Sequence, residues 1–401
     1  MALNVKVGLI GPLDMLKFKN MAKVREKNIQ NAPAKEISGE FIINSKAKTL
    51  HPDVQELEIT EIIDHSLAGA KTFVFKATKG KVAYFRAGQY ISIKEQIGDS
   101  FVTRPYSISS SPKDAKNGKI AITVKTNPTG YAAEYFLKEW KVGKRVIASD
   151  PQGQFYYEPM RDGKTVIACA GGSGITPFLS MAQAIRDGAE DFNLTILFGS
   201  RNKESILFAK EFDEITKATD KVKVVHVLSD EEVEGYEHGF INAELIKKYA
   251  PQTDYSVFIC GPEAMYRFIE KELPLLNLPE KNIRRELLGV TKKVWEQVGY
   301  PAECKDKNYK ITVKRGPIES VIDASANESV LVALERAGIK APSRCRSGEC
   351  GWCRSKLVSG SVFIPEENEG RRFSDIQFNY IHPCASFATS DLVIEVAGEY
   401  Y

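Results

Sequence analysis

The hydrophobic pattern of residues 53–158 is a series of short runs in which apolar and polar residues alternate, separated by Gly and Pro. Alternation with a period of two is typical of half-buried strands. One helix is expected, near Ala132–Glu139, and many short strands with a single helix predict a small antiparallel β-barrel. The six predicted strands are ELEITEII, KTFVFKA, GQYISIK, RPYSISS, KIAITVKT and RVIASD.

Between residues 159 and 290 the pattern changes to strands that alternate with helices. The strand KTVIACA is followed by a glycine-rich loop and by a helix that begins at Pro177 and ends at Gly188, as the preference for Pro in the first turn and Gly after the last turn predicts. The alternation predicts a doubly wound parallel α/β sheet, in which ligands bind at the carboxyl ends of the strands. The later elements are LTILFGS, a helix over 207–218, VKVVHVLS, INAELIKKYA, YSVFICG and a helix after Pro262.

The two ends of the chain follow other patterns. Residues 309–401 contain a predicted hairpin, YKITVKRG and SVIDA, then a helix and a last strand, DLVIEV, after a linker at 291–308.

In the N-terminal extension, residues 1–52, apolar residues recur at helical spacing between Leu13 and Lys27, with basic residues among them. We expect a docked helix with one solvated face; contact with a membrane surface or a partner is the alternative, and we assign the extension no function. The apolar residues are Met15, Phe18, Met21 and Val24.

Composition and charge narrow the class of protein. A chain of 401 residues is long enough for roughly two to four domains. Charged residues make up 27% and the net charge is +3, which indicates no broad basic surface for nucleic acid. Seven cysteines are too few for a disulfide scaffold, and no apolar run reaches the ~18 residues that a membrane span needs. We therefore expect a cytoplasmic protein without a transmembrane segment.

Four of the cysteines have the spacing of a plant-type [2Fe–2S] cluster, C-x4-C-x2-C followed about thirty residues later by a fourth thiol. Gly348 and Gly351 lie inside the loop, where residues without a Cβ let the backbone curl tightly around sulfur. Zinc is the alternative, but it usually takes two C-x2-C pairs or Cys/His pairs, so Cys345 or His382 would have to serve at an unusual interval. The predicted cluster ligands are Cys345, Cys350, Cys353 and Cys384.

The motif RPYS, formed by Arg104, Pro105, Tyr106 and Ser107, follows a GQY strand at Gly88–Tyr90. These residues resemble the flavin-binding barrel of the ferredoxin–NAD(P)+ reductase superfamily. On one face of a strand, an arginine can bind the flavin pyrophosphate through two hydrogen bonds, and a tyrosine two residues later can stack on the isoalloxazine ring. The resemblance implies these roles for Arg104 and Tyr106 and places Ser107 near flavin N5. Taken alone, RPYS could be an edge strand that tolerates proline.

The family has a second phosphate contact in a G-x-x-S/T segment that opens the single helix of the flavin domain. Gly130 matches this segment, but Ala133 stands where the hydroxyl is expected. Backbone N–H groups at the helix N-terminus can still bind phosphate. We expect FAD, with FMN as the alternative.

The loop GGSGITP lies at a strand end and leads into a helix, so its amides and the helix dipole suit a pyrophosphate. On spacing alone, a tight structural turn is an equal alternative. The loop resembles the family's nucleotide loop, and the family also has a CGP after a later strand, whose cysteine lies near the nicotinamide; otherwise Cys260 is a small buried hydrophobe. The resemblance implies nucleotide binding by Gly171, Gly172, Ser173, Gly174, Thr176, Cys260, Gly261 and Pro262.

In the family the nucleotide domain ends in a glutamate that is followed by an aromatic residue covering the flavin. Glu286 matches the glutamate, but Leu287 and Leu288 follow it. Either another group such as Trp295 covers the ring or no residue does. The catalytic candidates that the resemblance implies are Ser107, Cys260 and Glu286.

The end of the strand VKVVHVL predicts which nicotinamide nucleotide is used. NADPH-using members of the superfamily carry Ser-Arg here, and the arginine binds the 2′-phosphate; this chain has Ser229 and Asp230. A carboxylate can bind the ribose hydroxyls, and at ~5 Å and an effective dielectric of ~40 it repels a 2′-phosphate by roughly 3 kcal/mol. We expect NADH to be preferred about a hundredfold over NADPH, unless a nearby cation offsets the repulsion. The candidates for that offset are Arg201, Lys221 and Lys223.

Residues 309–401 resemble the β-grasp fold of plant-type ferredoxins, and the order flavin, nucleotide, ferredoxin is that of phthalate dioxygenase reductase and similar proteins. The resemblance implies an NAD(P)H-dependent oxidoreductase that passes electrons from NADH through flavin and [2Fe–2S] to an external protein acceptor, such as an oxygenase component. The alternative is a non-catalytic electron-transfer or regulatory subunit with a relic nucleotide site. Basic residues around the cluster loop predict an acidic patch on the acceptor, with ordinary surface charge as the alternative. They are Arg344, Arg346, Arg354 and Lys356.

Overall fold

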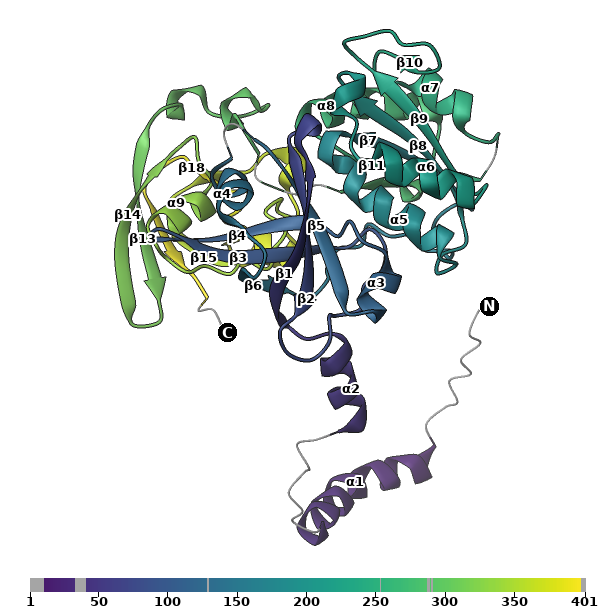
Figure 1. The fold of residues 1–401 in the computed structure, drawn as a ribbon. Coiled ribbons are helices and arrows are strands. Elements are labelled where there is room, and N and C mark those ends of the chain that lie inside the picture. Colours follow the sequence, from purple (N-terminus) through teal and green to yellow (C-terminus); the bar gives the residue numbers. More distant parts are fainter. Residues whose placement is uncertain are drawn as a thin grey trace. The chain divides into compact units, whose positions relative to one another are not determined.

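The computed structural model describes residues 11–32, 41–127, 130–252, 254–286, 289 and 291–397. The chain divides into two compact units, residues 1–46 and 47–401. Figure 1 shows the elements of both units in chain order.

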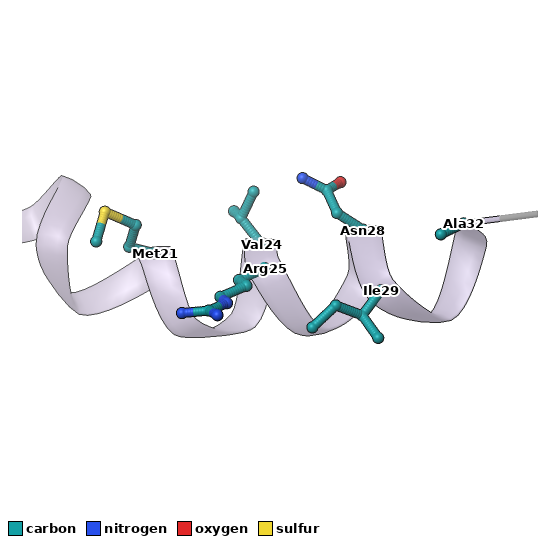
Figure 2. A pocket seen from close by; sticks show the side chains of 6 residues that line it. All are labelled: Met21, Val24, Arg25, Asn28, Ile29 and Ala32. Carbon is teal, nitrogen blue, oxygen red and sulfur yellow. The ribbon is translucent and has the colours of Figure 1, made fainter. Parts of the chain in front are cut away.

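The first unit contains the helix α1, Pro12–Asn31, and the start of α2, Ile42–Leu50. The helix predicted over this stretch is confirmed, and the expectation that it docks stays a prediction. Figure 2 shows a shallow hollow along α1 in which Val24 and Asn28 point one way and Arg25 and Ile29 another, so the apolar side chains do not form one stripe. None of the described helices combines the length and the hydrophobicity needed to cross a lipid bilayer.

The first sheet of the second unit is antiparallel, with the strand order β4-β3-β6-β1-β2-β5. The Ser109 N–H donates to the Ala121 carbonyl at 2.9 Å, which draws the chain after β4 toward β5 and curls the sheet into a half-barrel. All six predicted strands are confirmed; a short helix, α3, joins the predicted one, α4. The bounds are β1 Val54–His65, β2 Ala70–Ala77, β3 Tyr90–Ile97, β4 Ser100–Ser107, α3 Pro112–Lys116, β5 Lys119–Lys125, α4 Tyr131–Glu139 and β6 Arg145–Ser149.

The second sheet is parallel, with the order β10-β9-β8-β7-β11-β12. Alternate residues of β7 enter different cores, since Val166 and Ala168 pack with α5 and α6 whereas Ile167 and Cys169 pack with α7 and α8. Helices therefore cover both faces, which confirms the doubly wound fold; the short strands β10 and β12 were not predicted. The bounds are β7 Thr165–Gly171, α5 Thr176–Arg186, β8 Asn193–Ser200, α6 Ala209–Ala218, β9 Val222–Leu228, β10 Glu237–His238, α7 Ala243–Tyr249, β11 Tyr255–Cys260, α8 Glu263–Glu272 and β12 Ile283–Arg285.

The third sheet has the order β14-β13-β19-β15-β17 and packs on α9. The predicted hairpin, helix and last strand are all present, as the β-grasp fold requires. The predicted linker is packed against this part of the chain, since Val294 and Cys304 are buried and the Thr291 side chain bonds Asn368. The bounds are β13 Asn308–Arg315, β14 Ile318–Ser325, α9 Val330–Arg336, β15 Ser355–Ser359, β16 Val362–Phe363, α10 Phe373–Gln377, β17 Tyr380–Ile381, β18 Phe387–Ala388 and β19 Leu392–Glu395.

Candidate active site

The four predicted ligand cysteines converge in the loop after α9 and at the start of the segment before β18. The sulfur of Cys353 lies 3.4 Å from that of Cys384. The Cys350 N–H points at the sulfur of Cys345 over 3.4 Å, and hydrogen bonds from the Cys350 and Cys384 thiols lower the pKa of Cys345. Buried sulfurs that already accept hydrogen bonds are suited to act as thiolate ligands.

The loop backbone is shaped to surround a cluster. Gly348 has a φ of +91°, and a Cβ there would lie 2.2 Å from the Asn368 carbonyl oxygen, so only glycine fits. Buried His382 contacts the Gly348 carbonyl at 2.5 Å, and its other ring nitrogen faces Asp375 at 3.6 Å. Among the described residues, no three His, Cys, Asp or Glu side chains are placed to hold a single metal ion. The four thiols and the tight loop fit the ligand set of a two-iron cluster.

The predicted flavin strand is β4, paired with β3. Arg104 lies opposite Ile93 and Tyr106 opposite Ile91, so the two side chains share one face, as predicted. Ser107 lies opposite Tyr90 and is buried. Pro105 lies opposite Ser92 in the same ladder, and Gly130 is the residue before the first turn of α4.

The Arg104 guanidinium is held by a carboxylate from a distant part of the chain. Its Nη1 donates to both oxygens of Glu335 at 3.1 Å, and Arg346 donates to the same carboxylate at 2.5 Å. The exposed fractions of the side chains are 22% for Arg104, 7% for Glu335 and 3% for Arg346. Two guanidinium groups share one carboxylate in a largely buried place, which leaves an excess positive charge. A flavin pyrophosphate at Arg104 would neutralise it, so these residues fit the group.

The nucleotide loop and the CGP segment meet because both follow adjacent parallel strands, β7 and β11. A Cβ on Gly174 would lie 2.1 Å from the Cys260 carbonyl oxygen, and one on Gly171 would lie 2.8 Å from Pro262. A Cβ on Gly261 would lie 3.2 Å from the Gly171 nitrogen. The two motifs can pack together only because these positions are glycine.

Cations lie beside the same loop. The Lys125 ammonium lies 3.8 Å from where a Gly172 Cβ would be, and burial and Arg201 lower its pKa. The Thr176 hydroxyl donates to the Ser173 carbonyl at 2.9 Å and fixes the start of α5. Exposed amides, a helix start and two cations together fit a nucleotide pyrophosphate.

Comparison with known proteins matches this chain to three family models in succession. They are the oxidoreductase FAD-binding domain at residues 56–157, the oxidoreductase NAD-binding domain at 169–271 and the 2Fe-2S iron-sulfur cluster binding domain at 313–389. The structure of phthalate dioxygenase reductase, titled a modular structure for electron transfer from pyridine nucleotides to [2Fe–2S], superposes with a TM-score of 0.60 at 25% identity, over 86% of this chain and 98% of that chain. The chain is a ferredoxin-reductase-type oxidoreductase with FAD-binding, NAD-binding and [2Fe–2S] domains in succession.

Two relatives of the reductase are monooxygenase components by name. The reductase is 26% identical to the glycine betaine monooxygenase reductase subunit of Chromohalobacter salexigens, over 81% of this chain and 91% of that protein. It is 28% identical to the ferredoxin reductase component of 3-ketosteroid-9-alpha-monooxygenase from Mycobacterium tuberculosis, over 85% of this chain and 95% of that protein.

These matches confirm the expected class and cofactors of the reductase. It is an NAD(P)H-dependent oxidoreductase of the ferredoxin-reductase type, with domains for FAD, NADH and a [2Fe–2S] cluster. When bound, a flavin can take two electrons from a reduced nicotinamide and release them singly to an iron–sulfur cluster. By its title, phthalate dioxygenase reductase transfers electrons from pyridine nucleotides to [2Fe–2S], which is the order of carriers predicted for this chain.

The reductase brings its predicted catalytic residues Cys260 and Glu286 together next to the cluster loop. Burial, followed by the charges of Glu349 and Cys345, raises the pKa of Glu286 well above its usual range. Burial and then Glu286 raise the pKa of Cys260. The Tyr266 hydroxyl lies 2.6 Å from the Glu286 carbonyl oxygen and fixes the backbone there. Glu286 Oε2 has no hydrogen-bond partner among the described residues, so a buried polar atom is directed at the site.

Tyr90 pairs with Ser107 of the flavin strand and also lies near Glu286 and the cluster loop. A Cβ on Gly153 would lie 3.0 Å from the Tyr90 ring and 3.9 Å from Glu286 Oε2. Burial, with the charges of Cys345 and Cys350, raises the pKa of Tyr90. The cluster loop, Tyr90 and Glu286 are thus neighbours. The sequence pointed to Tyr90 only as part of the GQY strand and to Gly153 not at all, because their closeness depends on three separate segments.

Ser229 and Asp230, which are predicted to select the coenzyme, directly follow β9, and Arg201 directly follows the neighbouring strand β8. The Ser229 hydroxyl donates to Asp230 Oδ1 at 2.6 Å, and the Asp230 N–H donates to the Arg201 carbonyl at 2.9 Å. Two of the three cations that could offset Asp230 have partners, since Lys221 pairs with Asp191 at 2.6 Å and Lys223 lies over a tyrosine ring. The Arg201 backbone lies beside Asp230, whereas the charge of its side chain acts on Lys125 and lowers the pKa of that ammonium.

Two expectations concern what covers the flavin. Leu287 and Leu288, which stand where an aromatic cap is expected, lie outside the described residues. Trp295 packs under Lys305, with the ammonium 5.7 Å from the ring centre.

Of the four basic residues around the cluster loop, Arg346 is buried against Glu335. Arg344 is mostly buried too; it pairs with Asp150 at 3.3 Å and stacks on Trp352. Arg354 pairs with Asp375 at 2.5 Å, and the Lys356 ammonium bonds the Phe378 carbonyl. Arg344 and Arg346 are thus largely buried in internal ion pairs, whereas the Arg354 side chain is 45% exposed, and the acidic patch on the acceptor stays a prediction.

Proposed function

We propose that the reductase oxidises NADH in preference to NADPH and passes electrons to an oxygenase component, in the cytoplasm. The observation that carries the proposal is the juxtaposition of Cys260, Glu286, Tyr90 and the cluster loop, which joins the nucleotide, flavin and iron–sulfur regions at one place. The names of two relatives, both reductase components of monooxygenases, support an oxygenase as acceptor.

We assign roles within the site residue by residue. Arg104 binds the flavin pyrophosphate, Tyr106 covers the ring from the face that it shares with Arg104, and Ser107 lies at the flavin edge. Cys260 and Glu286 position the nicotinamide, because burial keeps both groups uncharged beside an apolar ring.

The nucleotide phosphates bind the glycine loop between β7 and α5. The close packing of Gly174 on Cys260 supports this assignment, because a relic site would have no need to keep these positions free of side chains. Asp230 accepts the ribose hydroxyls and disfavours a 2′-phosphate. Cys345, Cys350, Cys353 and Cys384 hold the cluster.

Anaerobic mixing of the purified reductase with NADH tests the proposal. We expect the flavin absorption to bleach first and the iron–sulfur absorption to follow, with no other protein present. A flavin-loaded protein that stays oxidised for minutes would favour the alternative, an electron-transfer subunit that receives electrons from another enzyme. The oxygenase is then identified by capture on the immobilised reductase and confirmed by NADH-driven oxygenation that neither protein performs alone.

A further inference from the structure

The strand that carries the flavin motif is the edge strand of its sheet, and a side chain of the ferredoxin region covers that edge. In the order β4-β3-β6-β1-β2-β5, β4 has a neighbour on one side. Thr103 pairs with Lys94 of β3, while its N–H donates to Glu335 Oε1 at 3.3 Å. An edge amide that would otherwise face solvent is therefore satisfied by α9.

The same carboxylate joins both redox regions. Glu335 accepts from Arg104, which lies 231 residues earlier in the flavin strand, and from Arg346, which directly follows the cluster ligand Cys345. All three side chains are largely buried. Without the carboxylate, two guanidinium groups would face each other in a place of low dielectric.

Arg344, which directly precedes Cys345, pairs with Asp150 after β6 at 3.3 Å and is a second link between these regions, away from β4. Two more contacts lie at the far end of the β3–β4 hairpin. Lys340 lies over the Phe101 ring at 4.4 Å, and a Cβ on Gly338 would touch the Asp99 carbonyl oxygen at 2.9 Å. Both involve the turn at the end of the β3–β4 hairpin, whereas Glu335 contacts the part of β4 that leads into RPYS. Among the described residues, Glu335 is thus a buried polar link that contacts both the flavin strand β4 and the cluster loop.

We propose that Glu335 is a positioning residue that holds the ferredoxin domain against β4 and so sets the separation of flavin and cluster. Electron transfer falls steeply with distance, so the rate of cluster reduction depends on the fraction of molecules in the docked arrangement. The inference rests on the proposed electron path, because only there does the separation of flavin and cluster matter.

The test compares the holoenzyme with Glu335→Gln, which keeps the shape of the side chain but removes its charge. The matched control is Glu328→Gln, since Glu328 pairs with Arg336 at 2.6 Å entirely within the ferredoxin domain. In rapid mixing with NADH, we expect the ratio of the cluster-bleaching rate to the flavin-bleaching rate to fall about tenfold or more in Glu335→Gln. The control should keep the wild-type ratio. Hydrogen exchange, which needs no turnover, should show faster exchange of the Thr103 amide only in Glu335→Gln.

The outcomes separate the inference from the proposed function. If NADH did not bleach the flavin of the wild-type protein, the proposed function itself would be refuted. A Glu335→Gln protein with full flavin and iron content but unchanged rate ratio and unchanged Thr103 exchange would overturn the positioning role. Glu335→Asp guards against misfolding, since it keeps the charge and shortens the reach. Loss of the cluster from both Glu335 variants would make Glu335 a residue that only stabilises the ferredoxin domain, which also overturns the inference.

Discussion

Replacing Gly174 by alanine tests whether the packing of the two glycine motifs makes the nucleotide site. Gly174 does not have the positive φ that would itself disfavour alanine, so the effect is steric. The added Cβ would lie 2.1 Å from the Cys260 carbonyl oxygen and 2.4 Å from its carbon, more than an ångström inside ordinary contact. The obstacle is backbone in the buried strand β11, which cannot rotate away as a side chain could.

We expect the loop to move from the CGP segment at a cost of about 1–3 kcal/mol, the usual cost of overpacking a tight site. If that cost falls on nucleotide binding, the KM for NADH rises roughly 5- to 150-fold. Steady-state reduction of a dye by NADH measures it, and flavin and iron contents show that the rest of the protein is intact.

Gly199→Ala is the matched control for this substitution. Gly199 lies at the end of β8 beside Gly171, and its added Cβ would meet the Ala170 oxygen at 3.4 Å and Ile241 at 3.6 Å, both ordinary distances. We expect a near wild-type KM for the control. A Gly174→Ala protein with the same KM as the control would refute the steric argument.

Three further substitutions test the other parts of the site. Cys384→Ser should abolish the iron–sulfur absorption and EPR signal yet leave dye reduction by NADH largely intact, and a normal cluster in this variant would exclude Cys384 as the fourth ligand. Arg104→Ala removes a charge-assisted contact worth roughly 1.5–3 kcal/mol, so the protein should purify largely flavin-free; a fully yellow preparation would mean that the phosphate is held elsewhere. Asp230→Arg should shift the ratio of kcat/KM for NADH over NADPH about a hundredfold toward NADPH, from ~3 kcal/mol of repulsion, and a ratio that does not move would remove Asp230 from coenzyme selection.

Local patterns were enough to predict most elements of the second unit and the residues that carry its chemistry. The strand KTVIACA and the helix from Pro177 could be read because side-chain periodicity and terminal Pro and Gly act over a few residues. The cysteine spacing is equally local, since one loop supplies three of the four thiols. The short strands β10 and β12 were not predicted from the sequence. Two or three residues carry too little periodicity, and the pairing of these strands is set by their neighbours in the sheet.

Tertiary structure alone decided the environment of each charge. From the sequence, Arg104 and Arg346 both look like exposed cations beside a motif. In the structure both donate to Glu335, which is 231 residues from Arg104 and 11 residues from Arg346 in the chain. Whether a charge is a docking surface or an internal link depends on which segments the fold brings beside it, and desolvation and ion pairing act through space whatever the spacing in sequence.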